Sequence, residues 1–424
     1  GDPSGCSLAD IRAGSVDPTS ILMDPPSASD LASIKLYAYG TSMYVIKSDR
    51  SLWAWGGNAA REAGDPEYAG QLGDGTITPR FSPVKIGDGF SKLVLVNMRR
   101  FALKHDGTLW AWGENSRGYI GDGTRTLRNA PKLLMSGVQD IAASDRLAFA
   151  LKSDGSLWGW GENGNCNLGD GTNVDKESPV RIAGRFATVT VAGNRTHALT
   201  SAGSVWGWGS PPSGDGTLEQ RCTPTFVSTG FRSVYGARNG TYGIKDDGAL
   251  WAWGNTWSSG TGNETEVSPR RVVGSVASVH LGDYDFLHVL TNSGSIWGWG
   301  GNADGEVGSG TRTRVSSAEQ IGSGFSQVFD GSPYSAAASK ADGSVWMWGF
   351  NRFRWFDAGL PEFVTSPTLV LTGKAFVKVA SGEYTAIGLA QDGTVWSWGY
   401  WTTGDGRDFR QVHEPIPVLQ AVVR

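Results

Sequence analysis

The sequence predicts an all-β protein built from eight copies of one unit, and three observations support this prediction. A tryptophan-rich pattern, written SDGSLWGWG where it ends at Gly161, occurs eight times. The intervals between the first tryptophans of the copies are 57, 48, 48, 45, 46, 49 and 50 residues, a period typical of a propeller, solenoid or array. The 61 glycines fit many tight turns. The first tryptophans are Trp53, Trp110, Trp158, Trp206, Trp251, Trp297, Trp346 and Trp396.

Repeat 3 illustrates the expected unit. A first strand, A, begins at Val138, and residues 147–151 form an apolar second strand, B. Asp154-Gly155 predicts a tight hairpin turn, because glycine accepts a positive φ. Residues 156–160 form strand C, and Pro179 opens strand D, where an edge position tolerates the missing N–H. Four antiparallel strands per unit predict a blade, so we expect a single β-propeller with eight blades, the alternative being seven.

The paired tryptophans of strand C are expected to be scaffold. Side chains alternate along a strand, so Trp158 and Trp160 share one face while Leu157 and Gly159 share the other. The residue between the two tryptophans is usually small, so the tryptophan ridge of one blade is expected to pack on the open face of its neighbour. Each ring buries roughly 150–250 Å², which contributes several kcal/mol at about 25 cal/mol/Å². Function is therefore sought where the repeats differ.

Composition excludes several classes of function. A net charge of −4 with 18% charged residues argues against a nucleic-acid partner. No apolar stretch of about 18 residues occurs, so we expect no membrane insertion. The cysteines are Cys6, Cys166 and Cys222, without a CxxC pair, so no metal site is expected. A bridge between Cys166 and Cys222 of neighbouring repeats is conceivable, but free thiols are the favoured interpretation.

The ends of the chain suggest how the ring closes. We expect an N-terminal segment over residues 1–29 and the propeller over residues 30–424. Residues 17–23 contain a piece similar to strand D, and either this piece or residues 417–422 would supply a closing strand. The chain is expected to be a monomer.

A second repeated element follows strand C. It has the form Gly-Asp-Gly-Thr, as at residues 169–172 and 121–124. Its aspartates resemble calcium ligands, but neither EF-hand nor nonapeptide spacing is present. We therefore expect each carboxylate to cap backbone N–H groups within its own loop.

The spaced pattern F-x-x-V, dG-x-L-W-x-W-G-x-N, G-x-L-G-D-G-T and P closely resembles the regulator-of-chromosome-condensation repeat family over about residues 30–420. Its LWAWG form resembles the bacterial branch. The resemblance implies a β-propeller, and the family includes exchange factors for a small GTPase, a propeller inhibitor of β-lactamases and many protein-binding modules. Familiar members have seven blades. The longest extra segment here, residues 61–69, is short beside the wedge-like hairpin of the exchange factors, and no exchange residue can be assigned.

Chain path divides the loops between two faces of the ring. The A–B turns and C–D loops share one end of each blade, as at residues 144–146 and 161–172, and we name this end the loop face. The B–C turns and D–A links share the other end, the turn face. The turn face is uniform, whereas the A–B turns of the loop face vary. They include Arg99-Arg100, Asp145-Arg146, Asn194-Arg195-Thr196, Asp283-Tyr284-Asp285 and Glu383-Tyr384.

Aromatic and arginine side chains outside the repeated pattern gather in the C–D loops. Repeat 7 replaces the glycine pattern by FNRFRWF, and repeat 8 adds a Tyr-Trp pair one blade away. Such residues are usual anchors of protein interfaces. Alternatively, the rings fill a gap in the loop or form a glycan platform. The predicted partner-binding residues are Trp355, Trp401, Arg352, Phe353, Arg354, Phe356, Tyr400 and Trp257.

Catalytic signals are weak. The five histidines are scattered, and neither a G-x-S-x-G elbow nor a phosphate-binding loop is present. His197 and His288 fall on or near strand B, where a hydrogen-bonded structural histidine is expected. We therefore expect a non-enzymatic, protein-binding propeller without a cofactor, extracellular or on the cell surface. Its partner is expected to be another protein, with a small GTPase or a surface glycan as the alternatives.

Overall fold

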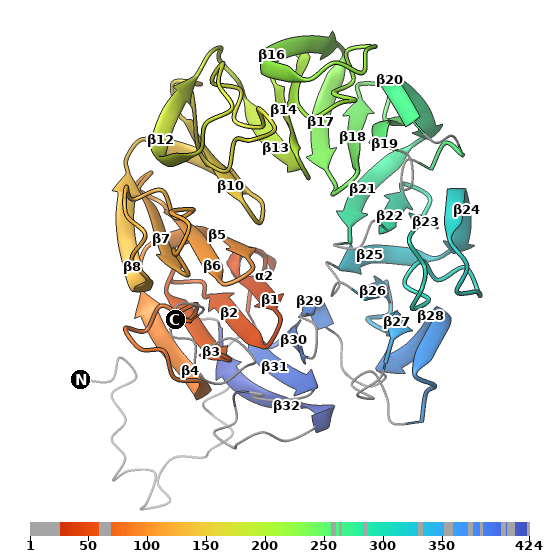
Figure 1. The fold of residues 1–424 in the computed structure, drawn as a ribbon. Helices are drawn as coiled ribbons and strands as arrows, with labels where there is room; N and C mark the ends of the chain where they lie inside the picture. The colour runs from red at the N-terminus through yellow and green to blue at the C-terminus, as the bar shows by residue number, and fades with distance from the viewer. Residues whose placement is uncertain are drawn as a thin grey trace, which may run out of the picture.

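The computed structural model describes residues 26–58, 69–255, 260–262, 265–282, 286–329, 334–351, 359–371, 376–381, 385–399, 404 and 412–421. These residues form a ring of eight four-stranded antiparallel sheets (Figure 1). The prediction of an all-β propeller with eight blades is confirmed. One short helix, α2 (Ala28–Ser33), precedes the first blade. None of the helices in the described part is long and apolar enough to span a membrane.

Blades 1 to 4 follow each other along the chain. In each blade the first strand lies on the inner side of the ring and the fourth on the outer side (Figure 1). Their strands are β1 (Lys35–Tyr39), β2 (Ser42–Ile46), β3 (Leu52–Gly56), β4 (Arg80–Gly87), β5 (Phe90–Val96), β6 (Arg99–Lys104), β7 (Leu109–Gly113), β8 (Arg128–Met135), β9 (Val138–Ala143), β10 (Leu147–Lys152), β11 (Leu157–Gly161), β12 (Lys176–Ile182), β13 (Thr188–Ala192), β14 (Arg195–Leu199), β15 (Val205–Gly209) and β16 (Arg221–Ser228).

Blades 5 to 8 repeat this order. Their strands are β17 (Phe231–Gly236), β18 (Gly240–Lys245), β19 (Leu250–Asn255), β20 (Thr265–Val273), β21 (Val276–Leu281), β22 (Phe286–Thr291), β23 (Ile296–Gly300), β24 (Val315–Gly322), β25 (Phe325–Phe329), β26 (Ser335–Lys340), β27 (Val345–Phe350), β28 (Phe363–Leu371), β29 (Phe376–Ser381), β30 (Thr385–Ala390), β31 (Thr394–Gly399) and β32 (Val412–Gln420).

The seam between neighbouring blades is built around the second tryptophan of each strand C. These eight rings are at most 1% exposed: Trp55, Trp112, Trp160, Trp208, Trp253, Trp299, Trp348 and Trp398. Trp160 of blade 3 packs against the C–D loop of blade 2 that contains Gly-Asp-Gly-Thr, and its Nε1 donates to the carbonyl oxygen of Tyr119 at 3.1 Å. A Cβ on Gly121 would lie 2.4 Å from that Nε1. The loop glycine therefore permits the close approach of the two blades.

The small residue between the tryptophans has a different role from the one predicted. A Cβ on Gly159 would lie 2.7 Å from Phe149 and 3.3 Å from Leu168, both of its own blade. Phe149 in turn meets Trp208 of the next blade edge-on, with ring centroids 6.2 Å apart. The tryptophan of the next blade thus contacts the loop glycine and Phe149. Gly159 leaves room for the side chains of Phe149 and Leu168 within its own blade.

Blades 8 and 1 meet through the same kind of seam. A Cβ on Gly404 would lie 2.6 Å from Trp55 Nε1. Lys378 on β29 donates its Nζ to the carbonyl oxygens of Leu31 and Ile34, at 2.9 and 2.5 Å, at the end of α2. Residues 417–420 belong to β32, the ordinary fourth strand of blade 8. The piece at residues 17–23 lies outside the described residues.

Candidate functional site

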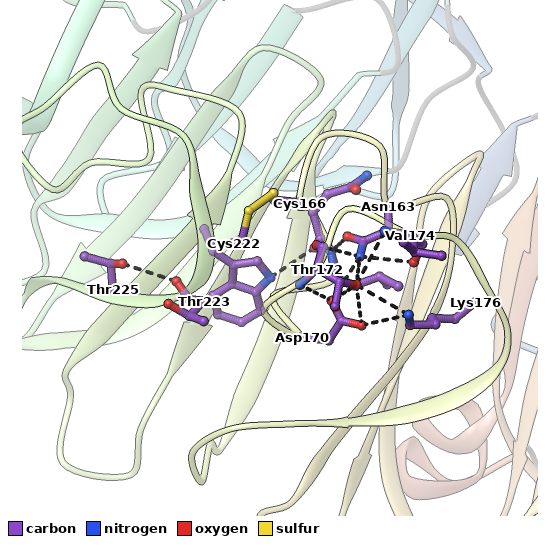
Figure 2. Close-up of a disulfide and its surroundings, with 12 residues drawn as sticks. Asn163, Cys166, Asp170, Thr172, Val174, Lys176, Cys222, Thr223 and Thr225 are labelled. Carbon is purple, nitrogen blue, oxygen red and sulfur yellow. Dashed lines mark hydrogen bonds and ion pairs between the residues drawn. A yellow bond between two sulfur atoms is a disulfide. The ribbon is translucent and has the colours of Figure 1, made fainter.

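The repeated loops of the loop face are internally satisfied. In blade 3, Asp170 Oδ1 accepts from the Thr172 backbone N–H at 2.9 Å and from Asn163 Nδ2 at 3.0 Å, and Oδ2 forms an ion pair with Lys176 at 3.3 Å (Figure 2). Burial alone would raise the pKa of Asp170, but the hydrogen bonds from Thr172, Asn163 and Lys176 together outweigh burial and hold that pKa below its usual value. Equivalent caps form at Asp74, Asp122 and Asp215. The predicted capping role of these aspartates is confirmed.

Two histidines take part in the seam. His197 and His288 are 0% and 1% exposed, as expected for structural residues. The shortened loop of repeat 4 places His197 Nε2 2.7 Å from the carbonyl oxygen of Ser213 and 3.0 Å from Trp253 Nε1. Burial lowers the pKa of His197 to about 3 and that of His288 to about 4. Both rings are therefore neutral at physiological pH.

A disulfide joins Cys166 in the C–D loop of blade 3 to Cys222 on β16 of blade 4 (Figure 2). The favoured interpretation of free thiols was therefore wrong. The reason lies in the seam. Cys166 has φ +60°, and the matching residues of blades 1 and 2 are Gly70 and Gly118, which also have positive φ. This loop position lies against the next blade's outer strand, so the two cysteine Cα atoms are only 4.5 Å apart.

The variable turns of the loop face are held by buried arginines. Arg99, the first residue of β6, is 5% exposed. Its Nη1 donates to Glu114 Oε2 at 2.8 Å, and its Nη2 donates across the seam to the carbonyl oxygen of Asp145 in the A–B turn of blade 3. The guanidinium lies 5.0 Å from the ring centre of Tyr119. Burial lowers the pKa of Arg99, and Glu114 opposes this shift.

Blades 4 and 5 repeat this arrangement. Arg195, the first residue of β14, is 4% exposed and donates its Nη2 to the carbonyl oxygen of Asn239 at 2.6 Å. Asn239 belongs to the A–B turn of blade 5. A Cβ on Gly193 would lie 2.2 Å from the carbonyl oxygen of Arg238, so the A–B turns of blades 4 and 5 touch. Each clamped turn carries an exposed arginine, Arg146 in blade 3 and Arg238 in blade 5.

Arg100 is the most buried charged residue of this region, at 1% exposure. Its Nε donates to Tyr44 Oη at 2.8 Å, and its Nη1 donates to the carbonyl oxygens of Asn97 and Arg99. Its guanidinium also lies 5.2 and 5.8 Å from the rings of Tyr44 and Tyr39. Arg100 therefore fixes the blade 1 and blade 2 turns from within.

All eight predicted partner-binding residues lie outside the described residues: Trp355, Trp401, Arg352, Phe353, Arg354, Phe356, Tyr400 and Trp257. Both ends of the repeat 7 loop are described. Phe350 and Phe363 face each other across β27 and β28, with ring centroids 5.6 Å apart. Arg312 of blade 6 lies 3.6 Å from the ring centre of Phe363, and Tyr334 packs 5.9 Å from Phe350. An aromatic stack with an arginine thus borders the predicted segment.

Sequence reasoning identified the variable A–B turns but assigned them no role. The signal was an arginine at the first position of strand B in repeats 2 and 4, Arg99 and Arg195. The role of this arginine depends on a carbonyl group of the next blade. The sequence does not show that the two groups lie close together. Among the described residues, no group of three or more His, Cys, Asp or Glu side chains could hold a metal ion.

Comparisons with known protein families agree with the repeated architecture described above. A model of the regulator of chromosome condensation (RCC1) repeat matches residues 106–151 and 154–199, and a second RCC1 repeat model matches residues 138–166 and 376–400. No curated protein sequence matches significantly.

Three solved structures are similar in fold. Prp20p from Saccharomyces cerevisiae, described with its binding to Gsp1p and histones, is 17% identical with a TM-score of 0.60, over 85% of this chain and 94% of that chain. Human WBSCR16 is 18% identical with a TM-score of 0.57, over 82% and 96%. Yeast RCC1 (Prp20) bound to Kap60 is 16% identical with a TM-score of 0.55, over 95% and 90%. At these identities the likeness concerns the fold.

Proposed function

We propose that this chain, an eight-bladed propeller that matches models of the RCC1 repeat over part of its length, is a non-enzymatic module that binds another protein through its loop face. The observation that carries the proposal is the contrast between repeated and variable residues. The repeated tryptophans, glycines and aspartates are used in the seams and in loop caps. The variable residues Arg146 and Arg238 lie in A–B turns, and the repeat 7 sequence over residues 352–358 departs from the glycine pattern.

The proposal includes an extracellular or cell-surface location. The disulfide between Cys166 and Cys222 supports it, because such bonds form and persist mainly in oxidising compartments. Thiol alkylation of the protein, trapped at the moment of harvest from its native cells, tests this part. We expect a single labelled thiol, that of Cys6, without reductant and three with reductant. Three labelled thiols in both samples would contradict an oxidising location.

Nucleotide exchange on a small GTPase is the second candidate. The fold similarity to Prp20p, whose structure was described with its binding to Gsp1p, supports it. The residues that would open a nucleotide pocket are not assigned. Release of a fluorescent guanine nucleotide from a panel of small GTPases tests this candidate, and acceleration by this protein at substoichiometric amounts would favour exchange over simple binding.

The binding module is tested with the predicted aromatic anchors. A partner captured by the full chain is titrated against Trp355→Ala combined with Trp401→Ala. We expect binding to weaken by at least about 2 kcal/mol, roughly 30-fold, with little change in the melting temperature. Phe226→Ala is the control, since Phe226 is 48% exposed on β16, an outer strand away from the loop face. Unchanged binding, or loss of fold together with binding, would show that these rings only pack. Binding of a glycan array in place of protein would overturn the proposal.

A further inference from the structure

We propose that the loop face over blades 2 to 5 docks an acidic segment, that is, clustered Asp and Glu side chains, of the partner protein. Arg146 and Arg238 are the residues that contact it. This inference rests on the proposed function and adds the chemistry of the partner to it. Three observations carry it: the way the turns are held, the balance of charge, and the hydrogen-bonding geometry of the exposed groups.

The first observation is that both arginine turns are held from beneath by a neighbouring blade. Arg99 donates to the carbonyl oxygen of Asp145, the residue before Arg146. Arg195 donates to the carbonyl oxygen of Asn239, the residue after Arg238. In each case a buried guanidinium of one blade clamps the A–B turn of the next. A held turn loses little entropy when a partner binds to the side chain that it presents.

The clamp below Arg146 is also part of a wider network. Arg146 forms an ion pair with Glu162 at 2.9 Å and has 59% of its side chain exposed. Glu162 Oε2 accepts from Tyr119 Oη at 3.1 Å, and Tyr119 stacks on Arg99. Glu162 therefore orients one edge of the Arg146 guanidinium while the rest of the group faces solvent. The network joins blades 2 and 3.

The second observation is a surplus of positive charge. We define the inner rim as the A–B turns, the first two residues of strand B, and the C–D loops up to the glycine that contacts the next blade. Over blades 2 to 5 the described part of the inner rim contains six arginines and three carboxylates. The arginines are Arg99, Arg100, Arg117, Arg146, Arg195 and Arg238, and the carboxylates are Glu114, Asp145 and Glu162.

Blade 6 has the opposite sign at the same positions. The described part of its inner rim carries Asp304 and Glu306, and no arginine. Burial raises the pKa of both carboxyl groups. The described part of the inner rim is therefore positive over blades 2 to 5 and acidic over blade 6. This polarity would orient an acidic segment toward the arginine turns and away from blade 6.

The third observation concerns the type of anion. A guanidinium presents a planar fork of N–H donors that matches a carboxylate bidentately. Two exposed arginines on separate turns suit a few carboxylates on a folded or extended protein segment. A nucleic acid would need a longer basic stripe than two exposed arginines provide.

The experiment uses the full chain and a fluorescein-labelled octaglutamate peptide, followed by anisotropy at several salt concentrations. Arg146→Gln combined with Arg238→Gln should weaken binding at least tenfold and reduce the dependence on salt. Arg181→Gln combined with Arg271→Gln is the matched control. These arginines are exposed on β12 and β20, the outer strands of the same two blades, so the control removes equal charge from a different place. The control should change binding less than twofold.

Equal weakening by both pairs would overturn the inference, since it would indicate diffuse charge rather than a site. So would the absence of octaglutamate binding, or equally tight and equally Arg146-dependent binding of a single-stranded oligonucleotide. A captured partner that binds the Arg146→Gln, Arg238→Gln protein normally but is lost from the Trp355→Ala, Trp401→Ala protein would contradict this inference alone and leave the proposed function standing. Melting temperatures of both glutamine pairs should equal that of the unmodified chain.

Discussion

The two tryptophans of each strand C lie two residues apart on one sheet face, yet their environments differ. Trp160 is fully buried in the seam between blades 2 and 3, whereas Trp158 is half-buried near the turn face. Lys152 lies 5.1 Å from the ring centre of Trp158, and Ser156 accepts its Nε1 hydrogen bond at 3.3 Å. Lysines lie over the first tryptophan in five of the eight blades, as far as the structure describes them. The comparison teaches that identical residues in one motif contribute differently, depending on whether a neighbouring blade covers them.

The largest expected effect separates these two positions directly. Trp160→Ala should destabilise the fold by about 3–5 kcal/mol, because it removes a buried ring and leaves a cavity in the seam. Trp158→Ala should cost roughly 1–2 kcal/mol, since solvent and a lysine already cover part of the ring. Urea unfolding of both variants measures the difference. Equal losses would contradict the distinction between seam and turn face.

The second prediction concerns the disulfide, which links the C–D loop of blade 3 to the outer strand of blade 4. Cys166→Gly with Cys222→Ser should lower the free energy of unfolding by roughly 2–4 kcal/mol through loss of the cross-link. Cys166→Ala with Cys222→Ser should cost about 1 kcal/mol more, because alanine keeps a Cβ in the left-handed conformation at φ +60°. Alanine usually destabilises a folded protein less than glycine does, and this order is expected to be reversed at residue 166. Thermal unfolding of the two double variants, both without the bridge, checks the order.

The buried histidines of the seam also predict a dependence on pH. His197 and His288 have folded pKa values of about 3 and about 4, against about 6.5 in the unfolded chain. The unfolded chain therefore binds more protons below pH 6.5, and stability falls as the pH drops, by about 1.4 kcal/mol per pH unit for each histidine. His288→Phe should remove one such contribution. Phe101 and Phe149 occupy the matching position in blades 2 and 3, so the variant should fold.

The measurement is the free energy of unfolding between pH 7 and pH 4.5. His105→Asn, an exposed substitution in a B–C turn, should keep the slope of the unmodified protein. An unchanged slope in His288→Phe would show that this ring is not the buried neutral group described above.

The smallest effect concerns the turn-face tryptophans. In blade 1, Ser51 accepts the hydrogen bond of Trp53 Nε1 at 2.9 Å. In blade 5, Nε1 of the matching Trp251 is buried without a hydrogen-bond partner, because Ala249 stands in place of that serine. Ala249→Ser should therefore stabilise the protein by about 0.5–1.5 kcal/mol, and Ser51→Ala should have the opposite effect. Melting temperatures measure both, and a lower value for Ala249→Ser would show that the pocket has no room for the hydroxyl group.

Much of the fold follows from patterns that are local in the chain. The Asp-Gly turns, the alternation along strand C and the capping of Thr172 by Asp170 depend on residues a few positions apart. Such contacts form in the same way in repeat after repeat, so the period alone predicts eight blades. The structural role of His197 and His288 was also predicted from their place on strand B.

Other features depend on which residues of neighbouring blades come together. The bridge between Cys166 and Cys222 spans a sequence separation of 56 residues, and its two ends meet only because the seam brings a loop against the next outer strand. The clamp from Arg99 to the carbonyl oxygen of Asp145 crosses a seam in the same way. The predicted role of Trp355 and Trp401 stays a prediction, since both lie outside the described residues.

The sequence by itself determined the repeated unit, its four strands and its caps, and it favoured eight blades over seven, because these depend on short-range periodicity and turn chemistry. Strand D of repeat 3 was expected to open at Pro179 but begins at Lys176. Only the tertiary structure decided which tryptophan of each pair is buried, which glycine meets it and which arginines clamp the loop face. The physical reason is that burial and cross-blade hydrogen bonds depend on the packing of one blade against the next, which brings together residues about 40 or more positions apart, as in the bonds of Trp160 and Arg99.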